Sequence, residues 1–194
     1  MLDRSALDLV ALSLEYPDAF VRTVLGRARP DGTALGEELG GAVWGLLSYL
    51  RLAPEHEPEE RYTTLFDLSP VCTLHVGYHL FGDAYQRGAL LAGLAAEMRR
   101  AEVPQKEGEL PDFLPSLLRL VARTGDAEDR ARLVDLVLRP GLARMAAALA
   151  ESEAPWAPVV RALPAALAKL GAGLPPPEIA APAPAPGEEA FADA

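Results

Sequence analysis

Two histidines and one cysteine lie close together in the sequence and have side chains that could do chemistry. His75 and His79 are four residues apart, Asp83 follows after another four, and Cys72 precedes them. Histidines at i and i+4 of a helix can share a metal ion, and a thiol beside a histidine can act as a nucleophile. The metalloprotease pattern needs a glutamate between the histidines, and His56, the one other histidine, falls in a predicted linker. We therefore predict packing and hydrogen-bonding roles for both histidines, with no metal, no cofactor and no catalytic residue.

A second set of residues combines one arginine with two carboxylates. Arg87 precedes a glycine, and Glu109 and Asp112 lie in the segment ELPDFLP. Because a guanidinium group can bind a carboxylate through two parallel hydrogen bonds, Arg87 can pair with Glu109 or Asp112 and join two helices. The alternative leaves Asp112 free, as a helix cap and as an anion for an arginine of a bound peptide. We favour the structural pair.

Three predicted helices must position these side chains. The first runs from Ser69-Pro70, a typical helix start, to Gly82, a typical end. The second covers residues 84–101, where large apolar residues recur at steps of three and four. Gly82 leads directly into it, so the two helices form a tight hairpin. The third helix is predicted to follow Asp112 as its N-cap and to end at Gly125.

The remainder of the chain is also predicted to be helical. Apolar periodicity indicates helices over 33–52 and 59–66, and no segment alternates in the manner of a strand. We expect an all-α fold, with a single compact helical-bundle domain over residues 1–170. Residues 171–194 contain 6 prolines, four acidic residues and no basic residue. Such a composition predicts a disordered C-terminal tail.

Composition excludes several classes of function. The net charge of −10 argues against nucleic-acid binding, which depends on clustered basic residues. No apolar run reaches the 18 residues of a membrane span, and the N-terminus lacks the pattern of a secretion signal. The single cysteine, Cys72, can form no intramolecular disulfide and is expected to be buried. These features indicate a cytoplasmic protein that does not insert into a membrane.

Three motifs in the order YxxLFD, HxxGxxxxRG and ELPDxLP resemble the NarJ type of molybdoenzyme assembly chaperone, also called the nitrate reductase delta subunit, of the TorD/DmsD/NarJ superfamily. A segment LEYPD over 14–18 is similar to the opening of that family. The resemblance covers roughly residues 5 to 170. The matching positions are Tyr62, Leu65, Phe66, Asp67, His79, Gly82, Arg87, Gly88, Glu109, Leu110, Pro111, Asp112, Leu114 and Pro115.

The resemblance implies an all-helical cytoplasmic chaperone that is not an enzyme. Such chaperones bind the N-terminal segment of a molybdoenzyme catalytic subunit, support insertion of the molybdenum cofactor and iron–sulfur centre, and delay membrane docking. Nitrate reductase is the favoured client, while related assembly factors serve selenate, chlorate or perchlorate reductases and hydrocarbon dehydrogenases. Cofactor-synthesis proteins are further candidate partners.

We expect the client segment to bind as an amphipathic helix in a groove between helices. The predicted groove residues are Tyr62, Phe66, His75, Tyr78, His79, Tyr85, Asp112 and Phe113. Phe113 stands where related chaperones often carry a histidine, so a polar role at this position is not carried over. Two alternatives remain. One is a helical regulatory domain that binds a small molecule, and the other is an enzyme with His75 or His79 as its base.

Overall fold

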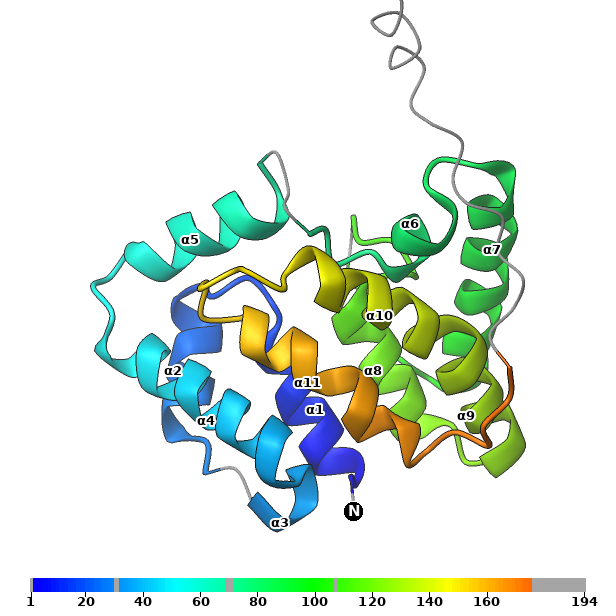
Figure 1. Ribbon diagram of the computed structural model, residues 1–194, viewed down its shortest axis with the longest axis horizontal. Coiled ribbons are helices and arrows are strands. Elements are labelled where there is room, and N and C mark those ends of the chain that lie inside the picture. Colours follow the sequence, from blue (N-terminus) through cyan, green and yellow to red (C-terminus); the bar gives the residue numbers. More distant parts are fainter. Residues whose placement is uncertain (1, 30–31, 69–71, 107, 176–194) are drawn as a thin grey trace, which may run out of the picture.

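The regular elements of the computed structural model are helices, which confirms the all-α prediction (Figure 1). The structure describes residues 2–29, 32–68, 72–106 and 108–175. The elements are α1 (Arg4–Ser13), α2 (Ala19–Arg27), α3 (Gly32–Leu35), α4 (Glu37–Leu52), α5 (Glu57–Phe66), α6 (Val76–Phe81), α7 (Tyr85–Arg100), α8 (Leu114–Arg123), α9 (Ala127–Leu133), the π-helix η1 (Val134–Leu138), α10 (Arg139–Ala148) and α11 (Ala157–Ala168).

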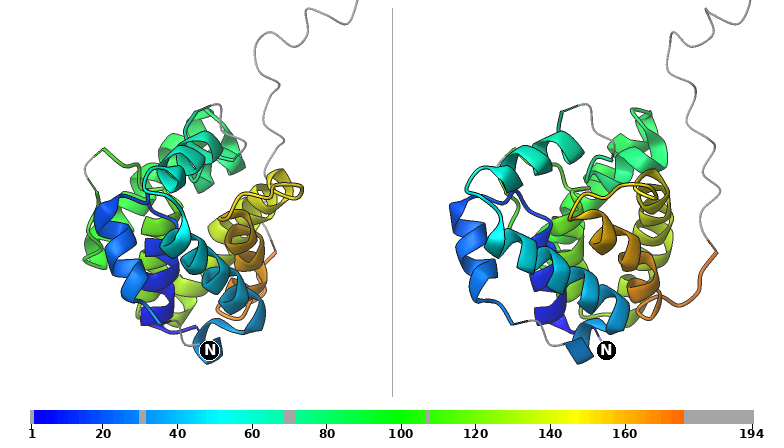
Figure 2. Two further views of the ribbon diagram at one scale, coloured as in Figure 1. Left: turned by 90° about the vertical axis from the view of Figure 1, so that its left-hand side faces the viewer. Right: turned by 60° about the vertical axis from the view of Figure 1, so that its left-hand side comes forward.

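The helices surround one hydrophobic core. α2 and α4 lie at one end of the long axis and α7 and α9 at the other, with α1, α8 and α11 between them (Figure 1). α1 packs against both α8 and α4, and α4 packs on α11 (Figure 2). α8 is the most deeply embedded helix, since seven of its ten residues are buried. Its apolar residues at i, i+3, i+4 and i+7 face this core, as the periodicity predicts.

An aromatic cluster fixes the C-terminal end of α1. The Trp156 side chain is fully buried, and its Nε1 donates to the Ser13 carbonyl at 3.1 Å. The Tyr62 hydroxyl donates to the Leu14 carbonyl at 3.0 Å. The two rings meet edge to face, with centroids 5.5 Å apart. Because a helix end leaves carbonyls without intrahelical partners, these two bonds stabilise the corner between α1 and α2.

The helix predicted from Ser69-Pro70 to Gly82 is shorter than expected. Its predicted start lies outside the described residues, and residues 72–75 are not helical. Instead, the Leu74 carbonyl accepts from Leu114 N at 2.9 Å, and Val76 N donates to the Asp112 carbonyl at 2.9 Å. These two bonds form an isolated antiparallel bridge between His75 and Phe113. The backbone N–H and C=O groups of this segment therefore bond to the segment before α8 and not to a helical turn of their own. Gly82 does end α6, in a conformation with φ 58°.

Two other predicted boundaries differ. The helix predicted over 33–52 is interrupted at Gly36, where φ is 78°, a conformation that helical residues do not adopt. The prediction of Asp112 as the N-cap of α8 is wrong. Phe113 occupies the cap position and makes no side-chain cap bond, while the Asp112 carboxylate is buried and bonded elsewhere. The helix predicted over 84–101 is confirmed as α7.

The residues that follow α11 are hydrogen-bonded to η1. Asp135 of η1 is buried, and its Oδ2 accepts from Ala172 N at 2.8 Å and Leu174 N at 3.0 Å. Its Oδ1 accepts from Arg139 Nη1 at 2.7 Å. The first residues of the predicted tail are therefore held against the helical domain. Residues 176–194 lie outside the described residues, so the disordered tail stays a prediction.

Candidate functional site

Four of the eight predicted groove residues line one cavity of about 320 Å³. They come from α5, from the segment before α6 and from the N-cap of α8, so residues far apart in the chain converge here. We call this the aromatic cavity, and its lining residues are Tyr16, Tyr62, Phe66, Asp67, Thr73, Leu74, His75, Lys106, Glu109 and Phe113. The volume lies near the lower end of the range for ligand sites, and suits a side chain or a small group.

Aromatic rings build the walls of the cavity. The Tyr62 ring meets Tyr16 edge to face at a centroid distance of 5.6 Å and Phe66 at 4.9 Å. Phe113 lies 5.7 Å from the His75 ring. Tyr62, Phe66 and Phe113 are buried, whereas Tyr16 is 38% exposed and reaches the surface. Burial raises the pKa of Tyr62, so its hydroxyl remains a neutral donor to the Leu14 carbonyl.

Asp112 links this cavity to α7 through a buried network. His75 Nδ1 donates to Asp112 Oδ1 at 3.0 Å, and Arg87 Nε donates to Asp112 Oδ2 at 2.9 Å. The Asp112 side chain has no solvent exposure. Burial alone would raise the pKa of Asp112, but the hydrogen bonds from His75 and Arg87 outweigh it and hold this pKa below its usual value. The predicted pair of Arg87 with an ELPD carboxylate is therefore present, and Asp112 is the partner.

Asp112 is not a free anion in this structure, which favours the structural pair over the peptide-facing alternative. Its two oxygens already accept from His75 and Arg87, and no part of the carboxylate reaches solvent. An anion that binds a partner's cation must come from elsewhere in the site.

His79 and Cys72 lie side by side next to Thr73, a residue of the cavity lining. Cys72 Sγ is 3.7 Å from His79 Nε2, the arrangement that an activated thiol would need. His79 Nε2, however, lies 2.7 Å from the Thr73 carbonyl, which can only accept, so this nitrogen carries a proton and cannot take one from the thiol. Burial raises the pKa of Cys72 to about 12 and lowers the pKa of His79. The pair is therefore structural and does not form a thiolate nucleophile.

The remaining predicted groove residues lie outside the cavity. Tyr78 is 45% exposed, and the Arg87 guanidinium stacks over its ring at 5.6 Å. Tyr85, at the start of α7, is 91% exposed. Among the motif residues, Leu114 and Pro115 are buried in the first turn of α8, Pro111 is half-buried, and Gly88 is exposed. Leu110 is 42% exposed beside the cavity residue Glu109.

Two ionisable residues, Asp67 and Lys106, complete the cavity with Glu109 and are not among the predicted groove residues. Asp67 belongs to the YxxLFD motif and was assigned no role, and Lys106 stands in a segment without periodicity. The motif position of Asp67 was the available signal. Lys106 gave none, because its place depends on how the chain between α7 and α8 returns to the core.

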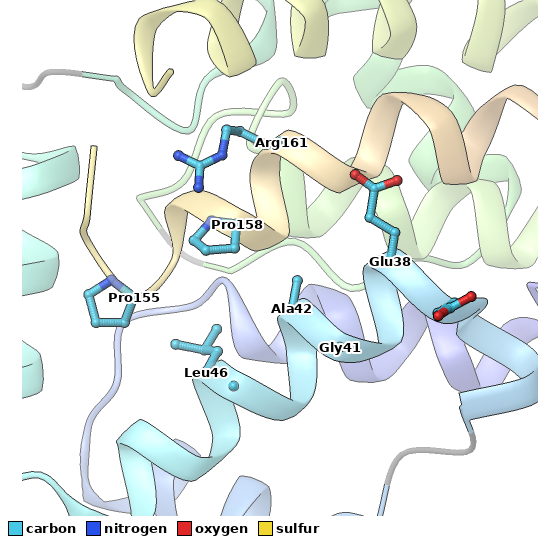
Figure 3. Close-up of a pocket in the computed structure, with 9 residues that line it drawn as sticks. Glu38, Gly41, Ala42, Leu46, Pro155, Pro158 and Arg161 are labelled. Carbon is cyan, nitrogen blue, oxygen red and sulfur yellow. The ribbon is translucent and has the colours of Figure 1, made fainter. Parts of the chain in front are cut away.

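A second hollow lies between α4 and α11, away from the predicted residues. Its volume is about 650 Å³, and Figure 3 shows Glu38, Gly41, Ala42 and Leu46 on α4 opposite Pro158 and Arg161 on α11. Arg161 donates to the carbonyls of Leu149 and Ser152, at 2.8 and 3.0 Å. Its guanidinium therefore already serves the end of α10. Within the described residues, no group of three or more His, Cys, Asp or Glu side chains could hold a metal ion.

The helical domain thus combines an aromatic cavity, a buried charge network and a neutral histidine whose Nε2 already carries a proton, an arrangement that offers room for a bound group but no activated thiol. No helix among the described residues is long and apolar enough to cross a membrane. No protein-family model matches the chain.

Relatives of known name identify the family. The chain is 30% identical over 164 residues to the probable nitrate reductase molybdenum cofactor assembly chaperone NarJ of Bacillus subtilis, covering 81% of this chain and 85% of the relative. It is 26% identical over 150 residues to the corresponding chaperone NarW of Escherichia coli, covering 77% of this chain and 62% of NarW. The nitrate reductase-like protein NarX of Mycobacterium tuberculosis is 36% identical over 117 residues, which are 60% of this chain but 18% of NarX. The chain belongs to the NarJ family of nitrate reductase molybdenum cofactor assembly chaperones.

Proposed function

We propose that this chain is a cytoplasmic chaperone that binds the N-terminal segment of a respiratory molybdoenzyme catalytic subunit, with nitrate reductase as the client. It keeps the apoenzyme competent to receive the molybdenum cofactor and the iron–sulfur centre before membrane docking. The observation that carries this proposal is the convergence of the YxxLFD and ELPDFLP motifs on one aromatic cavity. The names of the NarJ and NarW relatives support the choice of client.

The surface around the cavity suits a helical peptide with an apolar face. Leu68, directly after Asp67, is 67% exposed, and Leu110, directly after Glu109, is 42% exposed. Exposed apolar residues gathered beside a cavity mark interaction surfaces more often than isolated ones do. A peptide helix that packs on these leucines can insert one longer side chain into the cavity. The chain's net charge of −10 adds attraction for a basic client segment.

The client is tested by capture from the chain's own host. The tagged protein is isolated from cells grown anaerobically with nitrate, and the bound proteins are identified by mass spectrometry. We expect a cofactor-free molybdoenzyme catalytic subunit. A selenate, chlorate or perchlorate reductase subunit, or a hydrocarbon dehydrogenase subunit, would change the client within the same function. Absence of any large apoenzyme, while that enzyme is being made, would remove the chaperone proposal.

The binding surface is tested with a matched pair of aromatic variants. Tyr16→Ala removes a cavity wall that is 38% exposed, and Trp44→Ala removes a comparably exposed aromatic ring on α4, outside the cavity. Titration of the client's N-terminal peptide by calorimetry should show weaker binding for Tyr16→Ala by about tenfold and unchanged binding for Trp44→Ala. Thermal stabilisation by a metabolite, with no effect of the peptide, would instead support the small-molecule alternative.

A further inference from the structure

The aromatic cavity contains two carboxylates without a basic partner. Asp67 follows α5, and Glu109 lies in the loop before α8. Among the described residues, neither carboxylate accepts a side-chain hydrogen bond or forms an ion pair, whereas Asp112 nearby is doubly paired. Asp67 is exposed at the cavity mouth, where partial desolvation still raises its pKa and the neighbouring His75 offsets this effect only in part. Asp67, Glu109 and Lys106 are the charged side chains of the lining besides His75, and their formal charges of −1, −1 and +1 leave the cavity with a net charge of −1.

The hydrogen-bonding pattern of His75 adds a third acceptor. Its Nδ1 donates to the ionised Asp112, so in the neutral ring Nε2 carries a lone pair. The Tyr62 hydroxyl cannot serve a ligand as donor, because it already donates to the Leu14 carbonyl. The cavity is thus rich in acceptors, and Lys106 supplies its one side-chain cation. A ligand that offers several hydrogen-bond donors matches this set of acceptors.

The walls of the cavity favour a flat cation. The rings of Tyr16, Tyr62, Phe66 and Phe113 line it, and guanidinium groups stack on aromatic faces more readily than ammonium groups do. The cavity's volume of about 320 Å³ accommodates one long side chain but not a helix. Outside it, Leu68 and Leu110 each follow one of the two carboxylates and remain exposed.

We propose that the aromatic cavity binds an arginine side chain of the client segment, with its guanidinium between Asp67 and Glu109 and its apolar neighbours on Leu68 and Leu110. This inference rests on the proposed function for the source of the arginine. It assigns the anionic role to Asp67 and Glu109, because both Asp112 oxygens are already hydrogen-bonded within the fold. The recognised partner is therefore a basic residue flanked by apolar residues, on a helical peptide.

The test is a double-mutant cycle between the cavity and the peptide. The probes are the N-terminal peptide of the host's nitrate reductase catalytic subunit and copies in which each arginine in turn is citrulline, which has nearly the same shape and no charge. The proteins are wild type, the double variant Asp67→Asn with Glu109→Gln, and the control Glu151→Gln, an exposed carboxylate outside the cavity. Calorimetry at low salt gives each dissociation constant.

We expect one arginine of the peptide to account for the interaction with the two cavity carboxylates. The double variant should bind the arginine peptide about tenfold more weakly than wild type does, because hydrogen bonds to charged groups are the strong ones. It should bind the matching citrulline peptide within about twofold of wild type, and Glu151→Gln should change neither. Lys106→Met should increase the affinity for the arginine peptide, because it removes a cation that repels the guanidinium. Equal losses for the arginine and citrulline peptides at every position would overturn the inference.

A client-independent arm separates this inference from the proposed function. N-acetyl-arginine methylamide is titrated into the full chain, and shifts of the cavity's aromatic and His75 signals are followed by NMR. Shifts that are absent with the citrulline analogue, and absent in the double variant, support an arginine site even if no client peptide binds. If the client peptide binds and the arginine amide causes no shift at millimolar concentration, the chaperone function stands and the arginine site is wrong.

Discussion

Arg87 and Asp112 form a buried ion pair that joins α7 to the loop before α8. Arg87 Nε lies 2.9 Å from Asp112 Oδ2, and the two side chains are 15% and 0% exposed. His75 occupies the other carboxylate oxygen, so Asp112 has a partner on each side. Removing one member of such a pair leaves a buried charge unpaired, which costs far more than the loss of an exposed pair. This relationship makes the RG and ELPD motifs parts of one structural unit.

The first prediction concerns the stability that this pair supplies. Arg87→Met should lower the free energy of unfolding by about 2–4 kcal/mol, somewhat less than a fully orphaned buried charge, since His75 still bonds Asp112. The measurement is urea unfolding followed by circular dichroism.

Arg132→Met is the matched control for this substitution. It removes an arginine whose pair with Glu128 is 57% and 74% exposed, so the loss should stay below about 0.5 kcal/mol. Unchanged stability of Arg87→Met together with weaker peptide binding would mean that Arg87 serves the partner and not the fold.

The second prediction separates two helical glycines next to this network. A Cβ on Gly77 would lie 2.6 Å from Asp112 Oδ2, whereas a Cβ on the motif residue Gly88 would meet nothing within 4 Å. Gly88→Ala should therefore stabilise the fold by roughly 0.5–1 kcal/mol, the usual gain for alanine in a helix. Gly77→Ala should destabilise it by about 1–3 kcal/mol, because the paired carboxylate must move.

Thermal and urea unfolding of both glycine variants decide this point. Equal stability of the two variants would show that Asp112 can shift without losing its partners. If Gly88→Ala is stable but no longer binds the client peptide, the RG glycine keeps its surface open for the partner.

The helices could be predicted because their signals are local. Apolar spacing located α7 and α8, and Asp126, a residue type that is common at helix starts, accepts from Glu128 N and Asp129 N as the N-cap of α9. The prediction failed at Gly36, where one residue takes a positive φ, and before α6, where a distant segment pairs with the backbone. Residues 72–75 bond across to the segment before α8, and no periodicity in either segment announces that bridge.

The candidate site could be predicted only in part. The predicted aromatic groove residues Tyr62, Phe66 and Phe113 do meet in the cavity, since large apolar side chains converge where their elements pack. The choice of Asp112 over Glu109 as the partner of Arg87 could not be made from charge alone. It depends on which carboxylate the loop before α8 turns inward, and that is a property of the assembled fold.

The third prediction is a dependence of stability on pH that originates at His79. Burial is the largest effect on the pKa of His79 and lowers it. The hydrogen bond to the Thr73 carbonyl raises this pKa and offsets the effect of burial only in part. Of the nearby charged groups, Arg144 and His75 lower the pKa further, and Asp112 raises it. In the unfolded chain a histidine titrates near about pH 6.5. As the pH falls below this value, the unfolded state binds a proton that the folded state does not, so the free energy of unfolding decreases.

Urea unfolding between pH 8 and pH 5 tests this linkage. The wild type should keep the His79 contribution above about pH 6.5 and lose it progressively below, with a slope of up to about 1.4 kcal/mol per pH unit. His79→Gln should flatten this slope, while His56→Gln, which replaces a side chain that is 75% exposed, serves as the control. A slope that is unchanged in His79→Gln would assign the pH dependence to other groups.

The fourth prediction concerns the reactivity of Cys72, and it decides the enzyme alternative. The residue is 1% exposed, burial raises its pKa to about 12, and the neighbouring His79 nitrogen donates to the Thr73 carbonyl. With its pKa raised this far, the thiol stays almost entirely protonated at pH 8, while the thiolate is the form that reacts. The native protein should therefore resist a disulfide reagent such as Ellman's reagent, and labelling should rise with urea in step with unfolding. Rapid stoichiometric labelling without urea would instead mean an accessible, ionised thiol, and would reopen a nucleophilic role for the Cys72–His79 pair.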